Sequence, residues 1–262
     1  MIPYGRQTID EDDINAVVDV LKSDYLTTGP KIAEFEQAVA SYTGAKYAVA
    51  ISNGTSALHA ACFAAGIGRG DEVITTPLTF AASANCVLYC GGTPVFADVD
   101  PYTYNIDPED IRKKITDKTK MIVVVNPSNP TGGVFSRETL EKLSEIAITH
   151  DLLVIADEIY SQLVYDGTEH VSIASLPGMK ERTITLGGFS KAYSMTGWRL
   201  GYMCAPVGII QACVRVHQYT VTCASSFVQE AALTALSDCA EDVEAMRKEY
   251  QRRKDYVVKA LN

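Results

Sequence analysis

The sequence predicts an α/β fold in which a mostly parallel, seven-stranded sheet carries helices on both faces. Short apolar runs interleave with segments of helical apolar spacing, the pattern of strands followed by helices. Several apolar runs are unbroken, which is typical of parallel strands buried on both faces. With 262 residues and 47% hydrophobic content, the chain can form one large domain with at most a remnant of a second.

The elements follow from periodicity and from turn residues. Asp107 followed by Pro108 supplies an N-cap and a first-turn proline, and glycine-punctuated turns at 66–70 and 92–94 lead into short strands. The predicted helices are residues 11–22, 31–42, 55–65, 107–115, 137–150, 209–222 and 241–261. The predicted strands are residues 48–52, 72–76, 94–97, 121–125, 152–156, 183–186 and 200–204.

The pair Ser190-Lys191, followed after a short spacer by Thr196-Gly197-Trp198-Arg199, indicates the chemistry. A lysine beside small residues can form an imine with an aldehyde. An arginine eight positions further on can hold a nearby phosphate. A surface lysine and a structural arginine are the alternative, because both residue types are mostly exposed in globular proteins.

Two further segments place polar side chains at the ends of apolar runs. Residues 151–160 predict a buried parallel strand that delivers Asp157 to the edge where open α/β sheets bind ligands, with Tyr160 three residues later. Capping of the next element is the alternative role for Asp157. Residues 126–132 form a Pro-rich turn directly after the strand at 121–125, which an ordinary strand-to-helix turn also explains.

These segments place an amide, a carboxylate, a phenol, a lysine and an arginine at strand ends or turns. From residue 121 to the C-terminus the chain resembles the class I and II aminotransferases, which are fold type I enzymes that use pyridoxal 5′-phosphate. The resemblance is carried by Asn129-Pro130-Thr131-Gly132, by Asp157-Glu158-Ile159-Tyr160 and by the segment from Ser190 to Arg199. It implies the large cofactor-binding domain of that fold.

The resemblance also implies roles for individual residues. Lys191 would form the imine with the cofactor and, once freed by substrate, would move a proton between the substrate Cα and the cofactor C4′. Asp157 would pair with the pyridine nitrogen and keep it protonated, because an opposite charge favours the charged form. Asn129 and Tyr160 would hydrogen-bond the phenolic oxygen of the ring.

Phosphate contacts are expected from both halves of the chain. By resemblance, Arg199 would clamp the phosphate bidentately, with Ser190 as a second candidate. Residues 53–58 follow a strand and open a helix, so that Thr55 and Ser56 place hydroxyls, backbone amides and a positive dipole end where a phosphate can bind. A simple helix cap is the alternative.

Residues 1–120 resemble a different branch of fold type I, the sugar-nucleotide aminotransferases, which transfer an amino group to a keto-sugar. By that resemblance Thr55 and Ser56 would contact the phosphate and Phe80 would stack on the pyridine ring, although a Phe after a strand also fits a core position. Thr27 and Thr28 would line the sugar pocket. The two resemblances meet near residues 117–121, which predicts a composite chain, engineered or natural, whose function need not follow either parent.

The C-terminal part of the chain also differs from the pattern of both families. Both families continue past the helical stretch 240–262 into a small domain of about a hundred residues. We therefore expect this second domain to be absent or residual, and with it the arginine that grips the substrate α-carboxylate in the amino-acid enzymes. Cofactor binding by residues 1–262 is accordingly expected even without turnover.

Composition restricts the partners. The net charge of −9 disfavours nucleic acid and anionic membranes. Residues 1–6 and the acidic stretch after them lack a signal-peptide core, and no apolar run spans a bilayer, so a cytoplasmic protein is expected. The seven scattered cysteines indicate buried thiols. No His lies near them at metal-ligand spacing, so no metal site is expected. The four histidines are assigned no catalytic role, and the resemblance implies a homodimer.

The expected function is transamination with pyridoxal 5′-phosphate, between an amino donor and a keto acid or keto-sugar. Two alternatives stay open. One is a cofactor-binding scaffold without turnover. The other is a lyase or decarboxylase on the same fold, because the bond that breaks depends on its orientation over the cofactor ring.

Overall fold

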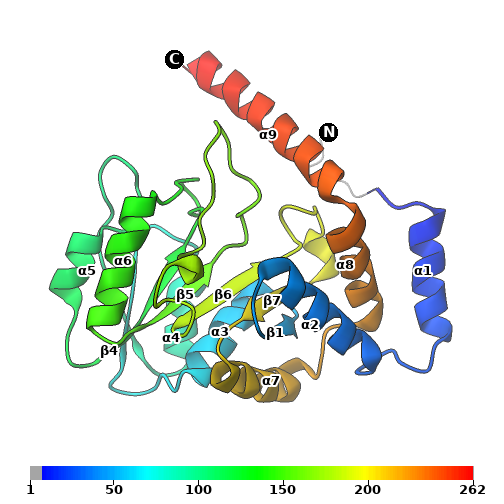
Figure 1. The fold of residues 1–262 in the computed structure, drawn as a ribbon, viewed down its shortest axis with the longest axis horizontal. Coiled ribbons are helices and arrows are strands. Elements are labelled where there is room, and N and C mark those ends of the chain that lie inside the picture. The colour runs from blue at the N-terminus through cyan, green and yellow to red at the C-terminus, as the bar shows by residue number, and fades with distance from the viewer. Residues whose placement is uncertain (1–7, 262) are drawn as a thin grey trace.

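The computed structural model describes residues 8–261, so residues 1–6, which entered the localisation prediction, lie outside the described residues. The central sheet has the strand order β1-β7-β6-β5-β4-β2-β3 and carries helices on both faces (Figure 1). Its strands are β1 (Ala48–Ile51), β2 (Glu72–Thr75), β3 (Thr93–Phe96), β4 (Thr119–Val125), β5 (Leu153–Asp157), β6 (Thr183–Gly188) and β7 (Gly201–Cys204). The predicted mostly parallel, seven-stranded α/β sheet is confirmed.

Strand β7 is the antiparallel member of the sheet, and it pairs in that sense with both β6 and β1. The remaining neighbours pair in parallel. The connection from β6 to β7 contains a single 3-10 turn, Thr196–Trp198, and no α-helix to carry the chain back across the sheet, which accounts for the reversal. Because β7 reverses direction between them, β1 and β6 run the same way.

The helices are α1 (Glu11–Lys22), α2 (Pro30–Thr43), α3 (Gly54–Ala64), α4 (Ala82–Tyr89), α5 (Pro108–Lys114), α6 (Arg137–Thr149), α7 (Val207–Val221), α8 (Ser226–Asp238) and α9 (Ala240–Leu261). Each predicted helix is present within two residues of its expected bounds. Asp107 is the N-cap of α5, as predicted, and accepts the amide of Glu109. Helices α4 and α8 were not predicted.

Alternate side chains of the strands fill different cores. Val123 and Ile155 face α3, α4 and α7, whereas Val124 and Val154 face α5 and α6. A third cluster lies between β1, β7 and the helices α2 and α8, and includes Phe35. Full burial of an aliphatic side chain contributes about 1.5 to 3 kcal/mol, so three such clusters make the sheet a rigid support for the loops at its ends.

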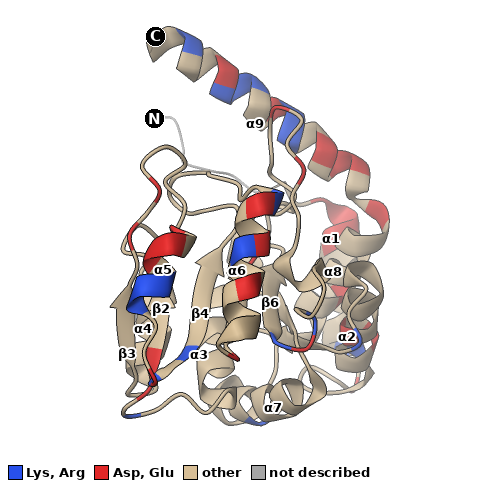
Figure 2. Ribbon diagram, turned by 60° about the vertical axis from the view of Figure 1, so that its left-hand side comes forward, with Lys and Arg blue, Asp and Glu red and all other residues tan. Residues whose placement is uncertain are grey.

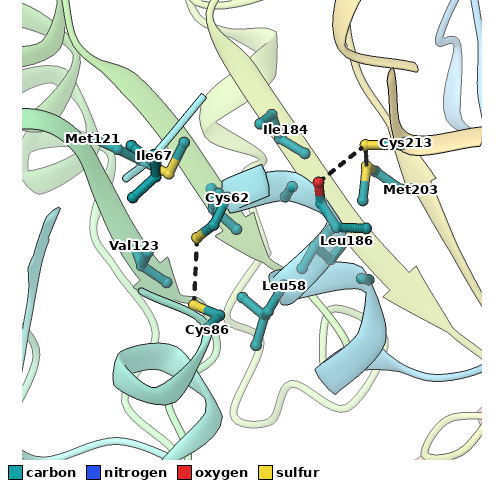
Figure 3. Packing of buried hydrophobic residues seen from close by; sticks show 14 of the residues in the cluster. Leu58, Cys62, Ile67, Cys86, Met121, Val123, Ile184, Leu186, Met203 and Cys213 are labelled. Atoms are coloured by element: carbon teal, nitrogen blue, oxygen red, sulfur yellow. Dashed lines mark hydrogen bonds between the residues drawn. The ribbon is translucent and has the colours of Figure 1, made fainter. Parts of the chain in front are cut away.

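Cysteines occupy the first of these cores (Figure 3). The Cys62 and Cys86 sulfurs lie 3.5 Å apart, and Cys213 lies 3.3 Å from the Met203 sulfur. All seven cysteines are free thiols. The predicted burial is confirmed for Cys62, Cys86, Cys204 and Cys213. It is wrong for Cys90, Cys223 and Cys239, which are only partly buried because they lie at the C-terminal ends of α4, α7 and α8, where the chain returns to the surface.

Charged residues occur along α5, α6 and α9 (Figure 2). On α6 they form pairs one turn apart, such as Arg137 with Glu141 at 3.0 Å. Exposed pairs of this kind contribute only a few tenths of a kcal/mol each. No helix among residues 8–261 has the length and apolar character needed to cross a bilayer.

Candidate active site

The carboxyl ends of β1, β2, β4, β5 and β6 and the amino end of β7 meet at one edge of the sheet, because these five strands run parallel and β7 runs against them. This is the edge at which open α/β sheets bind ligands. The predicted site residues all belong to segments that leave or enter this edge: Thr55 and Ser56 after β1, Phe80 after β2, Asn129 after β4, Asp157 and Tyr160 at the end of β5, Ser190 and Lys191 after β6, and Arg199 before β7.

Three of these residues form a contiguous group. The Asn129 side-chain amide donates to the Tyr160 hydroxyl at 3.4 Å. The Lys191 Nζ lies 5.5 Å from the centre of the Tyr160 ring, over its face. An amine, a phenol and an amide from three separate strand ends are thereby brought together.

Asp157 is the last residue of β5 and is paired through the sheet with Val125 and Leu186. Its Oδ1 accepts the Ile159 amide at 3.2 Å, within a turn rather than at the start of a helix. Burial raises the pKa of Asp157 to about 6, opposed by that hydrogen bond and by the positive charge of Lys191. The carboxylate therefore lies close enough to Lys191 for the two charges to interact.

The loop between β6 and β7 is folded on itself around Ser190 and Arg199. The Thr196 hydroxyl donates to the Ser190 carbonyl at 2.9 Å, and Arg199 Nη1 donates to the Thr196 carbonyl at 2.9 Å. Arg199 has a φ of 59°, a left-handed conformation that non-glycine residues adopt only where surrounding contacts hold them. Arg199 is exposed, whereas Ser190 is partly buried.

At the end of β1, the turn opens helix α3. Asn53 is the N-cap, and its Oδ1 accepts the Ser56 amide at 2.9 Å. The amides of Gly54 and Thr55 have no acceptor within residues 8–261, and Thr55 is exposed. Both the cap and the amides available to an anion are therefore present at one helix N-terminus.

Phe80 and the predicted sugar-pocket threonines lie at the surface. Phe80 is 55% exposed, so its alternative role as a core residue is excluded. Thr27 and Thr28 are exposed and contact Cys223, with the Thr27 hydroxyl and the Thr28 amide each 3.2 Å from its sulfur. Stacking by Phe80 and sugar contacts by the two threonines stay predictions.

Two titratable residues near the site carry no role in the sequence analysis. Glu158 follows Asp157 but is 9% exposed, and burial raises its pKa to about 7. His217 is 5% exposed on α7, and its Nε2 accepts the Ser52 amide at 3.3 Å. The sequence placed Glu158 within a motif, but its burial, and the approach of His217 to residue 52, depend on the tertiary structure.

The family model for "Aminotransferase class I and II" matches residues 15–262. The chain belongs to the class I and II aminotransferase family. This family uses pyridoxal 5′-phosphate, and the residues gathered at the sheet edge fit that cofactor: a lysine amine, a buried carboxylate at the same edge, a phenol and an amide in contact, and amides available at the start of α3. The family model covers both sides of residues 117–121.

Relatives in the aminotransferase family are similar over most of this chain. An aspartate aminotransferase of Pyrococcus abyssi is 45% identical over 198 residues, which are 74% of this chain and 50% of the relative. An aromatic-amino-acid aminotransferase of Thermococcus litoralis is 43% identical over 197 residues, 73% of this chain and 50% of the relative. The chain spans about half the length of the curated relatives it matches.

Solved aminotransferase structures agree with the fold. The aromatic aminotransferase of Pyrococcus horikoshii superimposes with a TM-score of 0.90 at 36% identity, covering 96% of this chain and 71% of that one. The aspartate aminotransferase of Thermus thermophilus with maleate gives 0.88 at 33% identity, covering 96% of this chain and 68% of that one. The predicted fold type I architecture is thereby confirmed. Among residues 8–261, no cluster of three or more His, Cys, Asp and Glu side chains could hold a metal ion.

Proposed function

We propose that residues 1–262 form the cofactor-binding domain of an aminotransferase that moves an amino group from an amino acid to a keto acid through pyridoxal 5′-phosphate. The observation that carries the proposal is the placement of Lys191 over the Tyr160 ring, within range of the Asp157 charge, at the carboxyl edge of the sheet. When bound, the cofactor supplies an aldehyde for the amine and a ring that accepts electrons from the substrate Cα.

Each residue of the group has a task that follows from its contacts. Lys191 holds the cofactor through its Nζ and, when free, carries the proton at that atom. Asp157, ionised above pH 6, favours a proton on the ring nitrogen, because an opposite charge at close range stabilises the charged form. Tyr160 and Asn129, already in contact, donate hydrogen bonds to an oxygen of the ring.

The phosphate is assigned to the start of α3 and to the loop before β7. The Gly54 and Thr55 amides, the Thr55 and Ser56 hydroxyls and the helix dipole favour an anion at the first position. Arg199 adds a guanidinium, with Ser190 as a further hydroxyl donor. Phe80, exposed at the same edge, is proposed to cover the ring.

The substrate class has two candidates. The names of the relatives support aspartate or an aromatic amino acid as the donor. The resemblance of residues 1–120 to sugar-nucleotide aminotransferases supports a keto-sugar as an alternative acceptor, with Thr27 and Thr28 lining its pocket. A composite chain that joins the two resemblances near residues 117–121 is part of this proposal.

A homodimer in the cytoplasm is also proposed. Large apolar side chains are exposed on the adjacent helices α3 and α4, where Phe63 is 59%, Leu88 55% and Tyr89 58% exposed. Burial of such a patch against a second copy removes it from water. Light scattering during size-exclusion chromatography should give twice the chain mass of 28.4 kDa, and the mass of a single chain would contradict the homodimer.

The function is tested in two steps. Pyridoxal 5′-phosphate is added to the wild-type chain, to Lys191→Ala and to the matched control Lys180→Ala, whose amine donates to the Gly44 carbonyl on the surface. The absorption band of the lysine-bound cofactor should appear in the wild type and the control alone, and borohydride should fix the cofactor on residue 191. An unchanged band in Lys191→Ala would refute the proposal.

The second step separates transamination from the alternatives. Aspartate, phenylalanine or tyrosine is added to the loaded protein, and the spectrum is followed for conversion to the pyridoxamine form. Conversion, reversed by a keto acid or a keto-sugar, supports transamination. A stable band with every donor supports the scaffold, and release of carbon dioxide or of a substrate fragment supports a decarboxylase or lyase.

A further inference from the structure

Strand β1 lies at the edge of the sheet and pairs on one side only, with β7. Two amides on its chain donate to side chains from helices on the two faces. The Ala50 amide donates to Glu36 Oε1 of α2 at 3.0 Å, and the Ser52 amide donates to His217 Nε2 of α7 at 3.3 Å. Unpaired edge amides are thus satisfied by partly or fully buried acceptors, which is one way that proteins protect an edge strand.

The contact with Ser52 defines the state of His217. Because Nε2 accepts a hydrogen bond it carries the lone pair, so the ring proton of the neutral imidazole resides on Nδ1. His217 is 5% exposed, and burial lowers its pKa, which favours the neutral ring. His217 is therefore a neutral, buried hydrogen-bond acceptor for the backbone amide of Ser52.

Ser52 connects this contact to the turn that opens α3. Its hydroxyl lies 3.5 Å from the Ser56 hydroxyl and 3.3 Å from the Asn53 side-chain amide. Asn53 in turn caps the Ser56 amide at 2.9 Å. The orientation of the first turn of α3 therefore depends on where Ser52 is held, and Ser52 is held by His217 from a different helix.

We propose that His217 is a positioning residue for the phosphate-binding turn: it fixes Ser52, and through Ser52 the amides and hydroxyls of residues 54–56, in the arrangement that receives a phosphate. The inference rests on the proposed function, which assigns the cofactor phosphate to this turn. His217 contacts neither cofactor nor substrate. Its effect is confined to ligands that carry the phosphate group.

The test compares two ligands, pyridoxal 5′-phosphate and pyridoxal, which differ only in the phosphate. Their dissociation constants are measured from the absorption of the lysine-bound form in the wild type, His217→Phe, His217→Leu and His217→Gln. His59→Leu is the matched control, because His59 lies on α3 and packs against the Tyr89 ring at 5.3 Å between centres.

Loss of the acceptor in His217→Phe or His217→Leu should weaken binding of the phosphate ester about tenfold, the effect of one hydrogen bond to a buried group, and leave pyridoxal within about twofold. His217→Gln, which offers an amide oxygen near the place of Nε2, should restore most of the loss. Equal weakening of both ligands, or no weakening in the acceptor-free variants, would overturn the inference.

The outcomes separate the inference from the function on which it rests. If the wild type binds neither ligand at Lys191, the proposed function fails. If the wild type prefers the phosphate ester and the acceptor-free variants keep that preference, only the role of His217 fails. Nitrogen-15 NMR of the wild-type imidazole supplies a test without substitution: a neutral ring protonated at Nδ1 is expected, and an imidazolium or an Nε2-protonated ring would overturn the inference.

Discussion

Replacement of Glu158 by glutamine should remove a dependence of stability on pH that the buried carboxyl imposes on the wild-type protein. Burial raises the pKa of Glu158 from its ordinary value of 4.5 to about 7; nearby polar groups of Ser172 and Ile173 oppose this shift, and the negative charge of Asp157 adds to it. The Glu158 side chain is 10% exposed, and His170 Nε2 lies 3.9 Å from its Oε2. Glutamine has nearly the same shape and no charge to lose.

The sign follows from proton linkage. A carboxyl whose pKa is higher in the folded state binds its proton more tightly there, so the stability that it contributes is complete below pH 4.5 and is lost as pH rises to about 7. At about 1.4 kcal/mol per pH unit, that difference corresponds to on the order of 3 kcal/mol, most of which falls between pH 5 and pH 8.

The assay is urea denaturation of the cofactor-free protein at pH 5, 6, 7 and 8, for the wild type, Glu158→Gln and the exposed control Glu181→Gln. Subtraction of the two free energies of unfolding at each pH cancels the titration of shared groups that lie away from residue 158. His170, whose Nε2 lies 3.9 Å from the Glu158 carboxyl, is coupled to that carboxyl and belongs to the measured difference. The stability of Glu158→Gln relative to the wild type should rise by about 2 to 3 kcal/mol from pH 5 to pH 8.

A constant difference between Glu158→Gln and the wild type at all four pH values would refute the reasoning, since it would mean that Glu158 titrates alike in the folded and unfolded states. A rise of similar size in Glu181→Gln would also refute it. In that case the effect would not depend on burial.

Three further substitutions test packing and capping, each by urea denaturation at a single pH. Asn53→Ala removes the cap on the Ser56 amide and should lower the free energy of unfolding by about 1 kcal/mol, and an unchanged value would contradict the capping contact. Leu58→Ala, at a side chain that is 1% exposed, should cost about 2 to 5 kcal/mol, and a loss below 1 kcal/mol would mean that the core refills the cavity. Gly187→Ala would place a Cβ in steric overlap with the Tyr202 ring and should cost about 1 to 3 kcal/mol, whereas the control Gly208→Ala has no neighbour within 4 Å and should be neutral or stabilising.

Local signals were sufficient for the strands and for most helices. Each strand is an apolar run bounded by turn residues. Asp107 as N-cap and Pro108 in the first turn mark the start of α5. Helix α4 (Ala82–Tyr89) could not be predicted because it is short, its side chains show no clear polar face, and its N-cap Ala81 makes no side-chain hydrogen bond. Helix α8 (Ser226–Asp238) has the same weakness, since Ser225 makes no capping hydrogen bond.

The site could be predicted as far as its residues follow strand ends. Asp157 ends an apolar strand and Lys191 and Asn129 follow others within four residues, so the parallel sheet brings all three to one edge. The support behind them could not be predicted in the same way. His217 lies 165 positions from Ser52 in the sequence, and only the packing of α7 against β1 brings its ring to that amide.

The predicted join near residues 117–121 lies far from the candidate site, which bears on how segments from both sides of the join can contribute to that site. Residues 117–121 include the start of β4, whereas the candidate site lies beyond its end at Val125, about 20 Å away at about 3.3 Å per residue. The pairing of β2 with β4 shifts register here, with Glu72 opposite Thr119 and Val73 opposite Met121, so that the exposed Lys120 is the extra residue.

Beyond that bulge the alternation of β4 matches its neighbours again. Val73 and Met121 face one core, and Ile74 and Ile122 face the other. A one-residue shift without the bulge would turn each apolar side chain of β4 to the opposite face. The irregularity therefore stays at the amino end of β4, and segments from both sides of residues 117–121 reach the carboxyl edge in register, where Thr55 and Phe80 lie at the same edge as Asn129, Asp157 and Lys191.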